Sequence, residues 1–463
     1  MMAPLVRYLI FPLWLRRDHP HYPRYVREFQ HTQFLTREEV KHLQWERLRK
    51  LLWHAYENCT FYRRRMQEAE IHPAAITRLE QVSALPVLTK SDIQDHAGEL
   101  LARNYPAAAR VRNQTGGSTG SPLQFYVDRE RLDSRMASTT RHNLWAGLRP
   151  GDWCARLWGA RLDQIVEQGW WDWCRNTLLY RLVELNTSCI RRDDWRTLVA
   201  ALRRKRPRFL VTYAQSACLF ARCVREAGID DIRFESILTT AEVLLSEQRH
   251  LLEETFRARV YNRYGCREVS VIATECEFHR GMHVNAEALL VEVVPDSSIP
   301  GSVGKIVVTD LLNYSMPLIR YEIGDAGRWA PEQDCPCGRG LPLLADVQGR
   351  TTDFLVLPDG RWVSGPALTL VVADMADVRQ VQFVQKAPAA VVLRVVPGRD
   401  YGSQTVAELR RRLGRYLDGH TALAIEEVEG IASEASGKYR FVINEVAAQQ
   451  QNVSRGDKAH AAV

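Results

Sequence analysis

Residues 209–256 read FLVTYAQSACLFARCVREAGIDDIRFESILTTAEVLLSEQRHLLEETF, and this stretch decides the fold class. Two β-rich runs, Phe209–Tyr213 and Ser236–Thr240, alternate with helical stretches such as Ser246–Phe256. A further β-rich run, GKIVVT, follows at residues 304–309. Strands that alternate with helices are typical of layered α/β structures. The pattern therefore predicts a large multi-layer α/β domain.

The sequence beyond Asp353 has a different order. Strand-like runs at residues 378–384 and 391–396 are followed by a helical run at 405–417 and by alternation through 423–431. This order predicts a compact α+β unit. The last residues are polar and rich in Ala and Gln, which predicts disorder. The expected divisions are a large domain over 1–352, a small domain over 353–446 and a disordered tail over 447–463.

The first helix with a clear start signal begins near Thr36. Thr36 and Glu39 have the spacing of a capping box, and Leu35 and Val40 stand at the positions of a hydrophobic staple. Apolar residues then recur at helical spacing, which predicts a core-facing stripe. The members of this stripe are Val40, Leu43, Leu48, Leu51, Leu52 and Ala55.

Composition bounds the class of protein. At roughly 100 to 200 residues per domain, 463 residues predict two to four structural units. The apolar share of 46% and the charged share of 25% are those of a globular protein and exclude collagen-like and wholly disordered chains. The net charge of +7 is a small excess, so we expect small acidic molecules rather than nucleic acid as partners.

The cysteines and the N-terminal segment bear on location. Ten cysteines at irregular spacing do not make a disulfide scaffold, and no signal peptide is evident, which favours a reduced, cytoplasmic protein. The apolar cluster at residues 9–15 is shorter than the ~20 residues that span a bilayer, so no transmembrane segment is expected. We expect this segment to dock on the domain surface; the alternative is peripheral membrane attachment as an amphipathic helix.

A loop rich in glycine and hydroxyl groups follows Asn113. It places three glycines and four hydroxyl side chains within seven positions, namely Thr115, Gly116, Gly117, Ser118, Thr119, Gly120 and Ser121. Such a loop can direct several N–H groups and hydroxyls at one anion, because glycine permits close approach. No lysine completes the Gly-x-x-x-x-Gly-Lys pattern, so this is not a Walker loop. The loop is predicted to bind phosphate; the alternative is that it is a flexible surface turn without a ligand.

Two further stretches place a carboxylate in a turn. In YNRYGCRE, residues 261–268, Glu268 follows a tight turn and could hold Mg²⁺ against a phosphate. In MPLIRYEIGD, residues 316–325, Asp325 follows an apolar run, where a carboxylate can accept hydrogen bonds from the vicinal hydroxyls of a ribose. Taken singly, an acid such as Glu268 in a polar turn is usually just solvated, and a plain turn residue explains Asp325 equally well.

Together these pieces occur in an order that resembles the adenylate-forming superfamily, and more closely its phenylacetate–coenzyme A ligase and capsule-biosynthesis (CapK-like) branch. The resemblance runs from the helix containing Leu43-Gln44-Trp45 to about Glu445. It implies a large N-terminal adenylation domain and a small mobile C-terminal domain, with an interdomain hinge at Asp353. It also implies that ATP and Mg²⁺ are bound.

The resemblance assigns the nucleotide contacts residue by residue. It implies that the loop from Thr115 to Gly120 holds the β- and γ-phosphates of ATP. It further implies that Ala241 and Glu242 lie along the adenine and that Tyr264 stacks on it.

The same resemblance covers the metal, the ribose and the catalytic step. Glu268 corresponds to the Mg²⁺ ligand, Asp325 to the acid that takes the ribose hydroxyls, and Arg350 to a residue beside them. Lys438, in the loop ASGKYR at residues 435–440, matches the catalytic lysine of adenylation. A flexible ammonium can stabilise charge as pyrophosphate leaves. Arg267 departs from the family, in which many members carry Thr before the acid.

Four residues form a candidate metal site. Cys276 and His283, with Cys335 and Cys337, offer three thiolates and one imidazole, the donor set of a structural Zn²⁺ site. The spacing lacks paired Cys-x-x-Cys motifs, but similar Cys/His positions occur in the family branch. His279 is a rival to His283, and the alternative to a metal site is four reduced side chains.

The reaction implied is ATP-dependent activation of a carboxylic acid, with an aryl acid favoured, as acyl-AMP. Transfer to a thiol such as coenzyme A is expected next; the alternatives are transfer to an amine or hydroxyl, or a non-catalytic nucleotide-binding relative. Aromatic residues could wall the acyl pocket beside Tyr213, although such clusters are more often core. The aromatic residues in question are a cluster of tryptophans, namely Trp145, Trp153, Trp158, Trp170, Trp171 and Trp173.

Overall fold

The structure is a computed structural model of the chain. Its described part excludes the expected tail at 447–463, so the prediction of disorder lies outside the described residues. Within the described part, no helix has both the length and the apolar character needed to cross a bilayer. The described residues are 2–114, 123–158, 175–186, 192–295, 303–331, 334–350, 354–358, 362–364, 368, 371–372, 375, 377–387, 389–417, 420–431 and 440–445.

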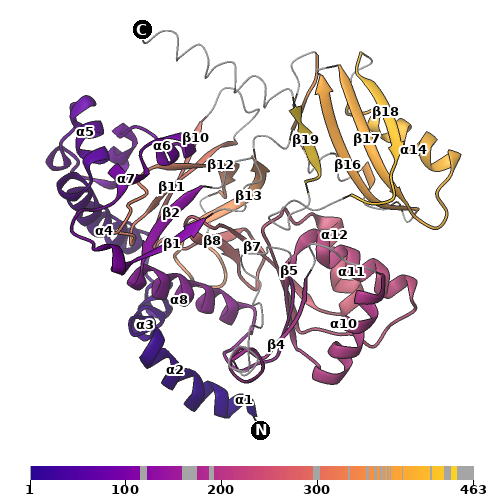
Figure 1. Ribbon diagram of the computed structural model, residues 1–463, viewed down its shortest axis with the longest axis horizontal. Coiled ribbons are helices and arrows are strands. Elements are labelled where there is room, and N and C mark those ends of the chain that lie inside the picture. The colour runs from indigo at the N-terminus through magenta and orange to yellow at the C-terminus, as the bar shows by residue number, and fades with distance from the viewer. Residues whose placement is uncertain are drawn as a thin grey trace.

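An 11-stranded sheet forms the centre of the large domain, in the order β10-β11-β12-β13-β9-β8-β7-β6-β5-β3-β4 (Figure 1). Strands β4, β3, β5, β6 and β7 are mutually parallel. From β7 to β10 every neighbouring pair is antiparallel. The bounds are β3 (Cys154–Trp158), β4 (Leu182–Asn186), β5 (Phe209–Tyr213), β6 (Ser236–Thr240), β7 (Arg259–Cys266), β8 (Ser270–Glu275), β9 (Met282–Val284), β10 (Leu289–Pro295), β11 (Gly304–Asp310), β12 (Tyr321–Trp329) and β13 (Leu343–Arg350).

Three helices connect the parallel strands: α10 (Arg192–Lys205), α11 (Ala214–Glu226) and α12 (Ser246–Phe256). They pack through stacked rings. Trp195 lies 5.2 Å from Phe220, and Phe220 lies 5.3 Å from Phe256, measured between ring centroids. These helices and strands are the alternating elements that the sequence predicts, so the large α/β domain is confirmed.

A helical layer precedes the sheet, and its main helix, α4 (Arg37–Asn58), begins at the predicted capping box. The Thr36 N–H donates to Glu39 Oε2 at 2.8 Å, and the Glu39 N–H donates to Thr36 Oγ1 at 3.3 Å. The other elements of this part are α3 (Tyr22–Thr32), α5 (Thr60–Glu68), α6 (Lys90–Asp95), α7 (Ala97–Leu100), β1 (Arg110–Gln114), β2 (Gln124–Asp128), α8 (Arg129–Trp145), the 3₁₀ turns Pro73–Ala75, Leu79–Ala84 and Ala107–Ala109, and the π-helical turn η6 (Arg175–Tyr180).

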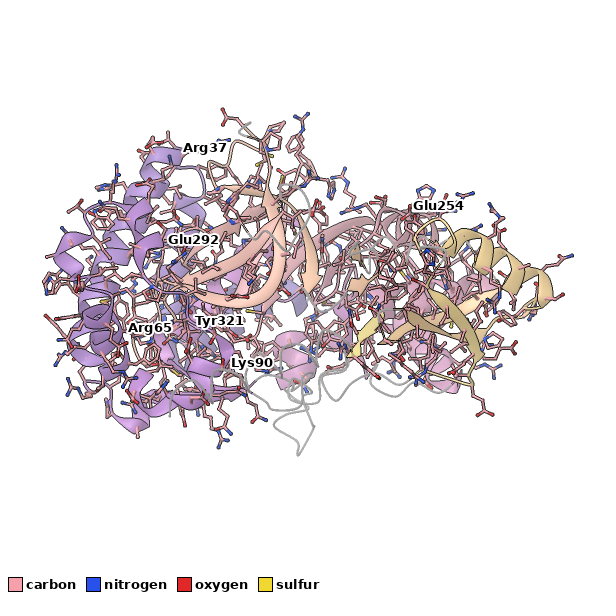
Figure 2. The ribbon with its side chains drawn as sticks, turned by 90° about the horizontal axis from the view of Figure 1, so that it is seen from above. Arg37, Arg65, Lys90, Glu254, Glu292 and Tyr321 are labelled. Carbon is pink, nitrogen blue, oxygen red and sulfur yellow. The ribbon has the colours of Figure 1, made fainter. Side chains whose placement is uncertain are left out.

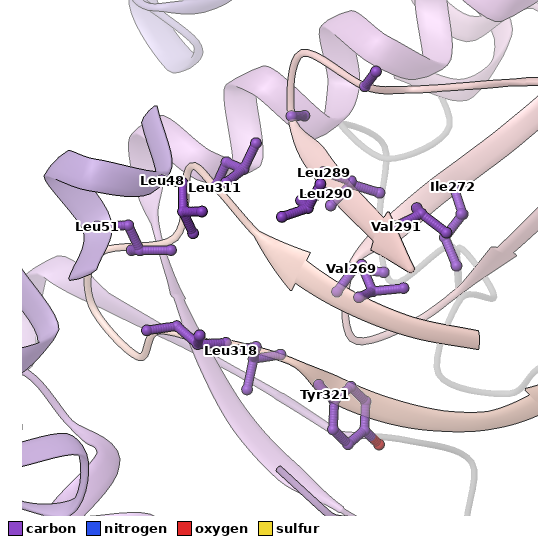
Figure 3. Packing of buried hydrophobic residues seen from close by; sticks show 14 of the residues in the cluster. Leu48, Leu51, Val269, Ile272, Leu289, Leu290, Val291, Leu311, Leu318 and Tyr321 are labelled. Carbon is purple, nitrogen blue, oxygen red and sulfur yellow. The ribbon is translucent and has the colours of Figure 1, made fainter. Parts of the chain in front are cut away.

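The apolar face of α4 joins the antiparallel half of the sheet in one core (Figure 3). Leu48 and Leu51 lie in this core with Leu289 on β10 and Leu318 in the loop before β12, and all four are fully buried. Burying a leucine side chain contributes about 1.5–3 kcal/mol. Of the predicted stripe, Leu43 is only half-buried, because the neighbouring Gln44 turns inward and donates to the Leu289 carbonyl at 2.9 Å.

The segment before α6 pairs with β12. The Leu88 N–H donates to the Arg320 carbonyl at 2.8 Å, and the Glu322 N–H donates to the Leu88 carbonyl at 2.9 Å. Helix α6 therefore starts, at Lys90, close to Tyr321 (Figure 2).

The C-terminal part carries its own core beneath a four-stranded sheet in the order β18-β17-β16-β19. The helix α14 (Ser403–Leu413) packs on it through the buried Leu409 and Leu413. The predicted α+β character is confirmed, although the helix ends at Leu413 and residues 414–417 form turns rather than helix. The strands are β14 (Phe354–Val356), β15 (Trp362–Ser364), β16 (Val378–Ala387), β17 (Ala390–Pro397), β18 (Ala422–Glu427) and β19 (Val442–Asn444).

One arginine joins the two parts of the chain. The Arg222 guanidinium, on α11, donates to the backbone carbonyls of Val378 and Arg379, on β16, at 3.2 Å each.

The N-terminal arm consists of α1 (Met2–Leu5), a π-helical turn η1 (Val6–Ile10) and α2 (Phe11–Asp18). Arg7 donates to Asp152 at 2.8 Å and to the Pro150 carbonyl at 3.0 Å. Val6 and Leu15 are buried. The segment is therefore docked on the large domain, as the sequence predicts.

Candidate active site

The carboxyl ends of the parallel strands meet at one edge of the sheet, the edge where open α/β sheets bind ligands. Strand β3 ends at Trp158, β5 at Tyr213 and β6 at Thr240. The rings of Trp158 and Tyr213 lie 4.5 Å apart and are tilted by 38°. Trp158, which is half-buried and backed by the fully buried Tyr213, forms an aromatic wall at the edge.

The other clustered tryptophans do not join this wall in the described part of the chain. Trp145 is buried in the core of the large domain, and Trp153 packs against the core under α10 and α11. Trp170, Trp171 and Trp173 lie outside the described residues.

Ala241 and Glu242 follow β6 directly at the same edge. Ala241 has φ of 67°, in the left-handed region that a residue with a Cβ rarely adopts. Such a conformation costs about 1–2 kcal/mol, and strained residues cluster at ligand-binding sites. Both side chains are half-buried, so they flank the edge without being sealed in the core.

Tyr264 and Asp325 link the two halves of the sheet. The Tyr264 hydroxyl, on β7, donates to Asp325 Oδ2, on β12, at 2.8 Å. Burial, and then the negative charge of Asp325, raise the pKa of the Tyr264 phenol well above its ordinary value. Tyr264 therefore stays protonated and acts as the donor. On the next strand, Arg350 is the backbone partner of Asp325; its side chain lies outside the description.

Glu268 lies in the turn between β7 and β8 and is held from two directions. The Tyr321 hydroxyl donates to Glu268 Oε1 at 3.0 Å. Arg135, on α8, donates to the carbonyls of Arg267 and Glu268. A carboxylate that accepts one hydrogen bond keeps lone pairs for a cation. The carboxylate of Glu268 is thus fixed in place and half-buried, which suits a Mg²⁺ ligand.

A buried ion pair supports this turn from below. Arg131 contacts Asp310 at 2.8 Å, and both side chains are almost fully buried. Arg131 also donates to the Val269 carbonyl at 3.2 Å, and Arg135 lies 3.5 Å from the Asp310 carboxylate. Burial and the neighbouring Arg131 lower the pKa of Arg135 to about 10. Arg135 therefore remains a cation at neutral pH and keeps its hydrogen bonds to the carbonyls of Arg267 and Glu268.

Several predicted residues lie outside the described part of the chain. They include Thr115, Gly116, Gly117, Ser118, Thr119 and Gly120, and also Asp353 and Lys438. The strands on either side of the glycine-rich loop are described. β1 and β2 pair antiparallel, with Gln114 opposite Gln124 at the end next to the loop.

The four residues of the predicted metal site come together from three segments. The ligand atoms of Cys276, His283, Cys335 and Cys337 all lie within 4.8 Å of one another. The Cys276 and Cys335 sulfurs are 3.6 Å apart, and Cys337 Sγ is 3.2 Å from His283 Nε2. Zn–S bonds of about 2.3 Å would place tetrahedral ligand atoms about 3.8 Å apart. The donor set therefore fits a zinc ion.

The surroundings of His283 suit a metal ligand. Its Nδ1 lies 3.2 Å from the Leu341 carbonyl, so donation there leaves Nε2 free to bind a metal. Burial lowers the pKa of His283 to about 4, which keeps the imidazole neutral. The rival His279 lies elsewhere, with Nδ1 3.1 Å from Glu275.

Sequence reasoning did not assign Tyr321 and Arg135 to the site. Tyr321 stands inside the stretch at 316–325, so its presence next to a candidate acid was a usable signal. No sequence signal pointed to Arg135, because the carbonyl of Arg267 that it contacts is 132 residues away in sequence.

Comparisons with known proteins show similarity to CapK and to phenylacetate–coenzyme A ligases. A family profile described as "CapK C-terminal domain" matches residues 355–445. The phenylacetate–coenzyme A ligase of Thermus thermophilus is 29% identical over 335 residues, which cover 70% of this chain and 73% of that protein. Protein CapK of Staphylococcus aureus is 23% identical over 412 residues, 87% of this chain and 89% of that protein.

A solved structure shares the fold over most of the chain. It is 2-hydroxyisobutyryl-CoA ligase in the postadenylation state, in complex with an acyl-AMP. The TM-score is 0.74 at 21% identity, covering 92% of this chain and 93% of that one. The same enzyme in an open conformation, with 2-HIB-AMP and CoA, gives a TM-score of 0.59.

Proposed function

We propose that this chain, which is similar to phenylacetate–coenzyme A ligases and to CapK over 70–87% of its length and shares its fold with 2-hydroxyisobutyryl-CoA ligase, is an adenylate-forming enzyme that activates a carboxylic acid with ATP as an acyl adenylate. The observation that carries the proposal is the linkage of Tyr264, Glu268, Tyr321 and Asp325 across the two halves of the sheet. These two hydrogen bonds connect two stretches that are weak signals singly, which supports a shared site beside the carboxyl edge of the parallel strands.

In the proposed first step, a substrate carboxylate oxygen attacks the α-phosphorus of ATP. The bond between the α-phosphorus and the bridging oxygen breaks, and pyrophosphate leaves. Glu268 would hold Mg²⁺, which neutralises phosphate charge. Thr115 to Gly120 would bind the β- and γ-phosphates, and Lys438 would stabilise the charge that develops at the reacting groups. Asp325, with Arg350 beside it, would take the ribose hydroxyls, while Ala241, Glu242 and Tyr264 would border the adenine.

The aromatic wall supports an aryl or other flat acid as substrate. Trp158 and Tyr213 lie at the carboxyl edge, next to the residues proposed for the adenine. Aromatic side chains favour stacking with aromatic rings. An acid bound there would have its carboxylate near the nucleotide and its ring against the wall.

In the proposed second step, the thiol of coenzyme A loses its proton and attacks the acyl carbon, and AMP leaves with the electron pair of the carbon–oxygen bond. The small domain would turn about Asp353 between the two steps, which removes Lys438 from the site. Transfer to an amine or hydroxyl is retained as the second candidate, because the C-terminal domain matches the CapK family.

We also propose a structural zinc ion at Cys276, His283, Cys335 and Cys337, and residence in the reducing cytoplasm. The buried, closed donor set supports the first proposal. The second is supported by the described cysteines, none of which is in a disulfide.

Acid-dependent exchange of labelled pyrophosphate into ATP tests the proposal. A panel of aryl and aliphatic acids identifies the substrate, and coenzyme A or amines are then added to find which consumes the adenylate. Lys438→Ala should reduce exchange by about 10²–10³-fold while ATP still binds. Lys386→Ala is the matched control, since Lys386 is an exposed lysine of the same small domain. ATP binding without exchange for any acid would identify a non-catalytic nucleotide-binding protein.

A further inference from the structure

The N-terminal arm presents apolar side chains to the solvent. Leu5, Tyr8, Leu9 and Leu13 are 44%, 74%, 53% and 55% exposed. They account for four of the nine exposed large apolar residues in the described part of the chain, and they fall within residues 5–13. We call these four residues the outer stripe. Exposed apolar groups gathered in this way mark an interaction surface rather than the scattered exposure of an ordinary protein surface.

The opposite face of the arm fixes the outer stripe in its outward orientation. Val6 and Leu15 are buried against the large domain, and Arg7 pairs with Asp152 at 2.8 Å. Gly151 permits this close contact, because a Cβ there would lie 2.8 Å from the Ala3 carbonyl oxygen. The arm is thus anchored by its inner face, and the outer stripe stays free.

The charge of the arm selects the partner. Residues 1–17 contain three arginines and no acidic residue. Arg7 is neutralised by Asp152, but Arg16 and Arg17 are exposed at the end of the outer stripe. The first acid, Asp18, lies 3.4 Å from Arg17 and offsets only part of this charge. An exposed apolar face that ends in arginines matches the boundary between acyl chains and anionic headgroups.

We propose that the arm docks the protein on an anionic lipid bilayer as an in-plane amphipathic helix. The outer stripe would enter the boundary between headgroups and acyl chains, with Arg16 and Arg17 on lipid phosphates. A second copy of the chain is a poorer occupant of this surface. The four exposed fractions amount to little more than two whole side chains, whereas a stable dimer interface takes roughly 20–30 residues a side.

Vesicle flotation with the full-length protein, tagged at its C-terminus, tests this proposal. The probes are vesicles of pure phosphatidylcholine and vesicles with about 30% phosphatidylglycerol. We expect binding to the anionic vesicles only, and loss of that binding at high salt. The double variant Leu9→Ser/Leu13→Ser should bind at least about tenfold more weakly, because it removes apolar burial. Arg16→Ser/Arg17→Ser should lose about tenfold or more.

The matched control is Phe34→Ser, which removes an apolar side chain of 56% exposure that lies outside the arm and should bind vesicles as the wild type does. Wild-type protein that fails to float with anionic vesicles overturns the proposal. So does a wild-type dimer, measured by light scattering, that the Leu9→Ser/Leu13→Ser variant converts to monomer without any vesicle binding. Pyrophosphate exchange measured on the same variants is independent of this result, so failure of the proposed enzyme activity would be recognised separately.

Discussion

Tyr264 and Asp325 lie on strands from opposite halves of the large sheet and are joined by a hydrogen bond of 2.8 Å from the phenol to the carboxylate. β7 is the last parallel strand, and β12 belongs to the antiparallel half. A residue proposed to stack on adenine thus orients a residue proposed to hold ribose. The two would act on one nucleoside as a coupled pair.

Tyr264→Phe and Asp325→Ala should therefore differ in their effect on the KM for ATP. The first keeps the ring and removes only the donor, so we expect the KM for ATP to rise by a few-fold. The second removes the proposed ribose contacts, and hydrogen bonds to a charged group are worth about 1.5–3 kcal/mol each, so we expect a rise of at least about tenfold. Pyrophosphate exchange at varied ATP measures both. An unchanged KM in Asp325→Ala would contradict the assignment.

Tyr321→Phe should weaken the binding of Mg²⁺. Without the Tyr321 hydroxyl, the Glu268 carboxylate loses a hydrogen bond of 3.0 Å and is free to turn away from the cation. At about 1.5–3 kcal/mol for a hydrogen bond to a charged group, half-maximal exchange should require roughly ten- to hundredfold more Mg²⁺, with the rate at saturating Mg²⁺ little changed. Titration of Mg²⁺ in the exchange assay checks this. Tyr401→Phe is the control, because the buried Tyr401 hydroxyl has no described hydrogen-bond partner.

Purified protein should contain one zinc ion per chain. Native mass spectrometry and metal analysis measure the content. Cys337→Ser should abolish it, since the remaining three ligands no longer close the shell. The same variant should unfold at a lower temperature, because binding free energy at a structural site contributes to folding. Cys223→Ser, a half-buried thiol outside the cluster, should retain the metal; equal zinc loss in both variants would count against the site.

His142 should make the fold sensitive to acid. Burial, and then the nearby Arg141, Arg263, His283 and Arg339, lower the pKa of His142 well below its ordinary value. In the unfolded chain the pKa returns to about 6.5, so below that pH the unfolded state binds a proton that the folded state does not. The free energy of unfolding therefore falls as the pH drops below about 6.5, by at most about 1.4 kcal/mol per pH unit for this group.

Urea unfolding of His142→Gln measures this contribution. Its stability should depend less steeply on pH between about 6.5 and 5 than that of the wild type. His250→Gln, at an exposed histidine, should keep the wild-type slope. Parallel slopes for wild type and His142→Gln would show that His142 is not the sensitive group.

Local signals in the sequence predicted much of this fold. The start of α4 depends on side chains three residues apart, and β5, β6 and α12 depend on composition within each run. The contacts that shape the site are of another kind. Tyr321 reaches Glu268 across 53 residues, and Arg131 reaches Asp310 across 179 residues. Periodicity within one segment carries no information about such pairs.

Charged residues in the core were also beyond prediction from pattern. The helix α8 buries Arg131, Arg135 and Arg141, which composition alone would place on a solvated face. Each is buried because a distant partner compensates its charge or accepts its hydrogen bonds, as Glu287 does for Arg141. The metal cluster was predicted from its donor set together with the resemblance to the family branch, and its four members do converge.

The contact made by Arg222 tolerates sequence change in the small domain. It grips the main chain of β16 at Val378 and Arg379, and a carbonyl oxygen is present whatever side chain occupies those positions. Substitutions at Val378 and Arg379 can therefore accumulate in evolution without loss of these two hydrogen bonds. Any swing of the small domain away from α11 must break both hydrogen bonds, which one guanidinium nitrogen of Arg222 donates.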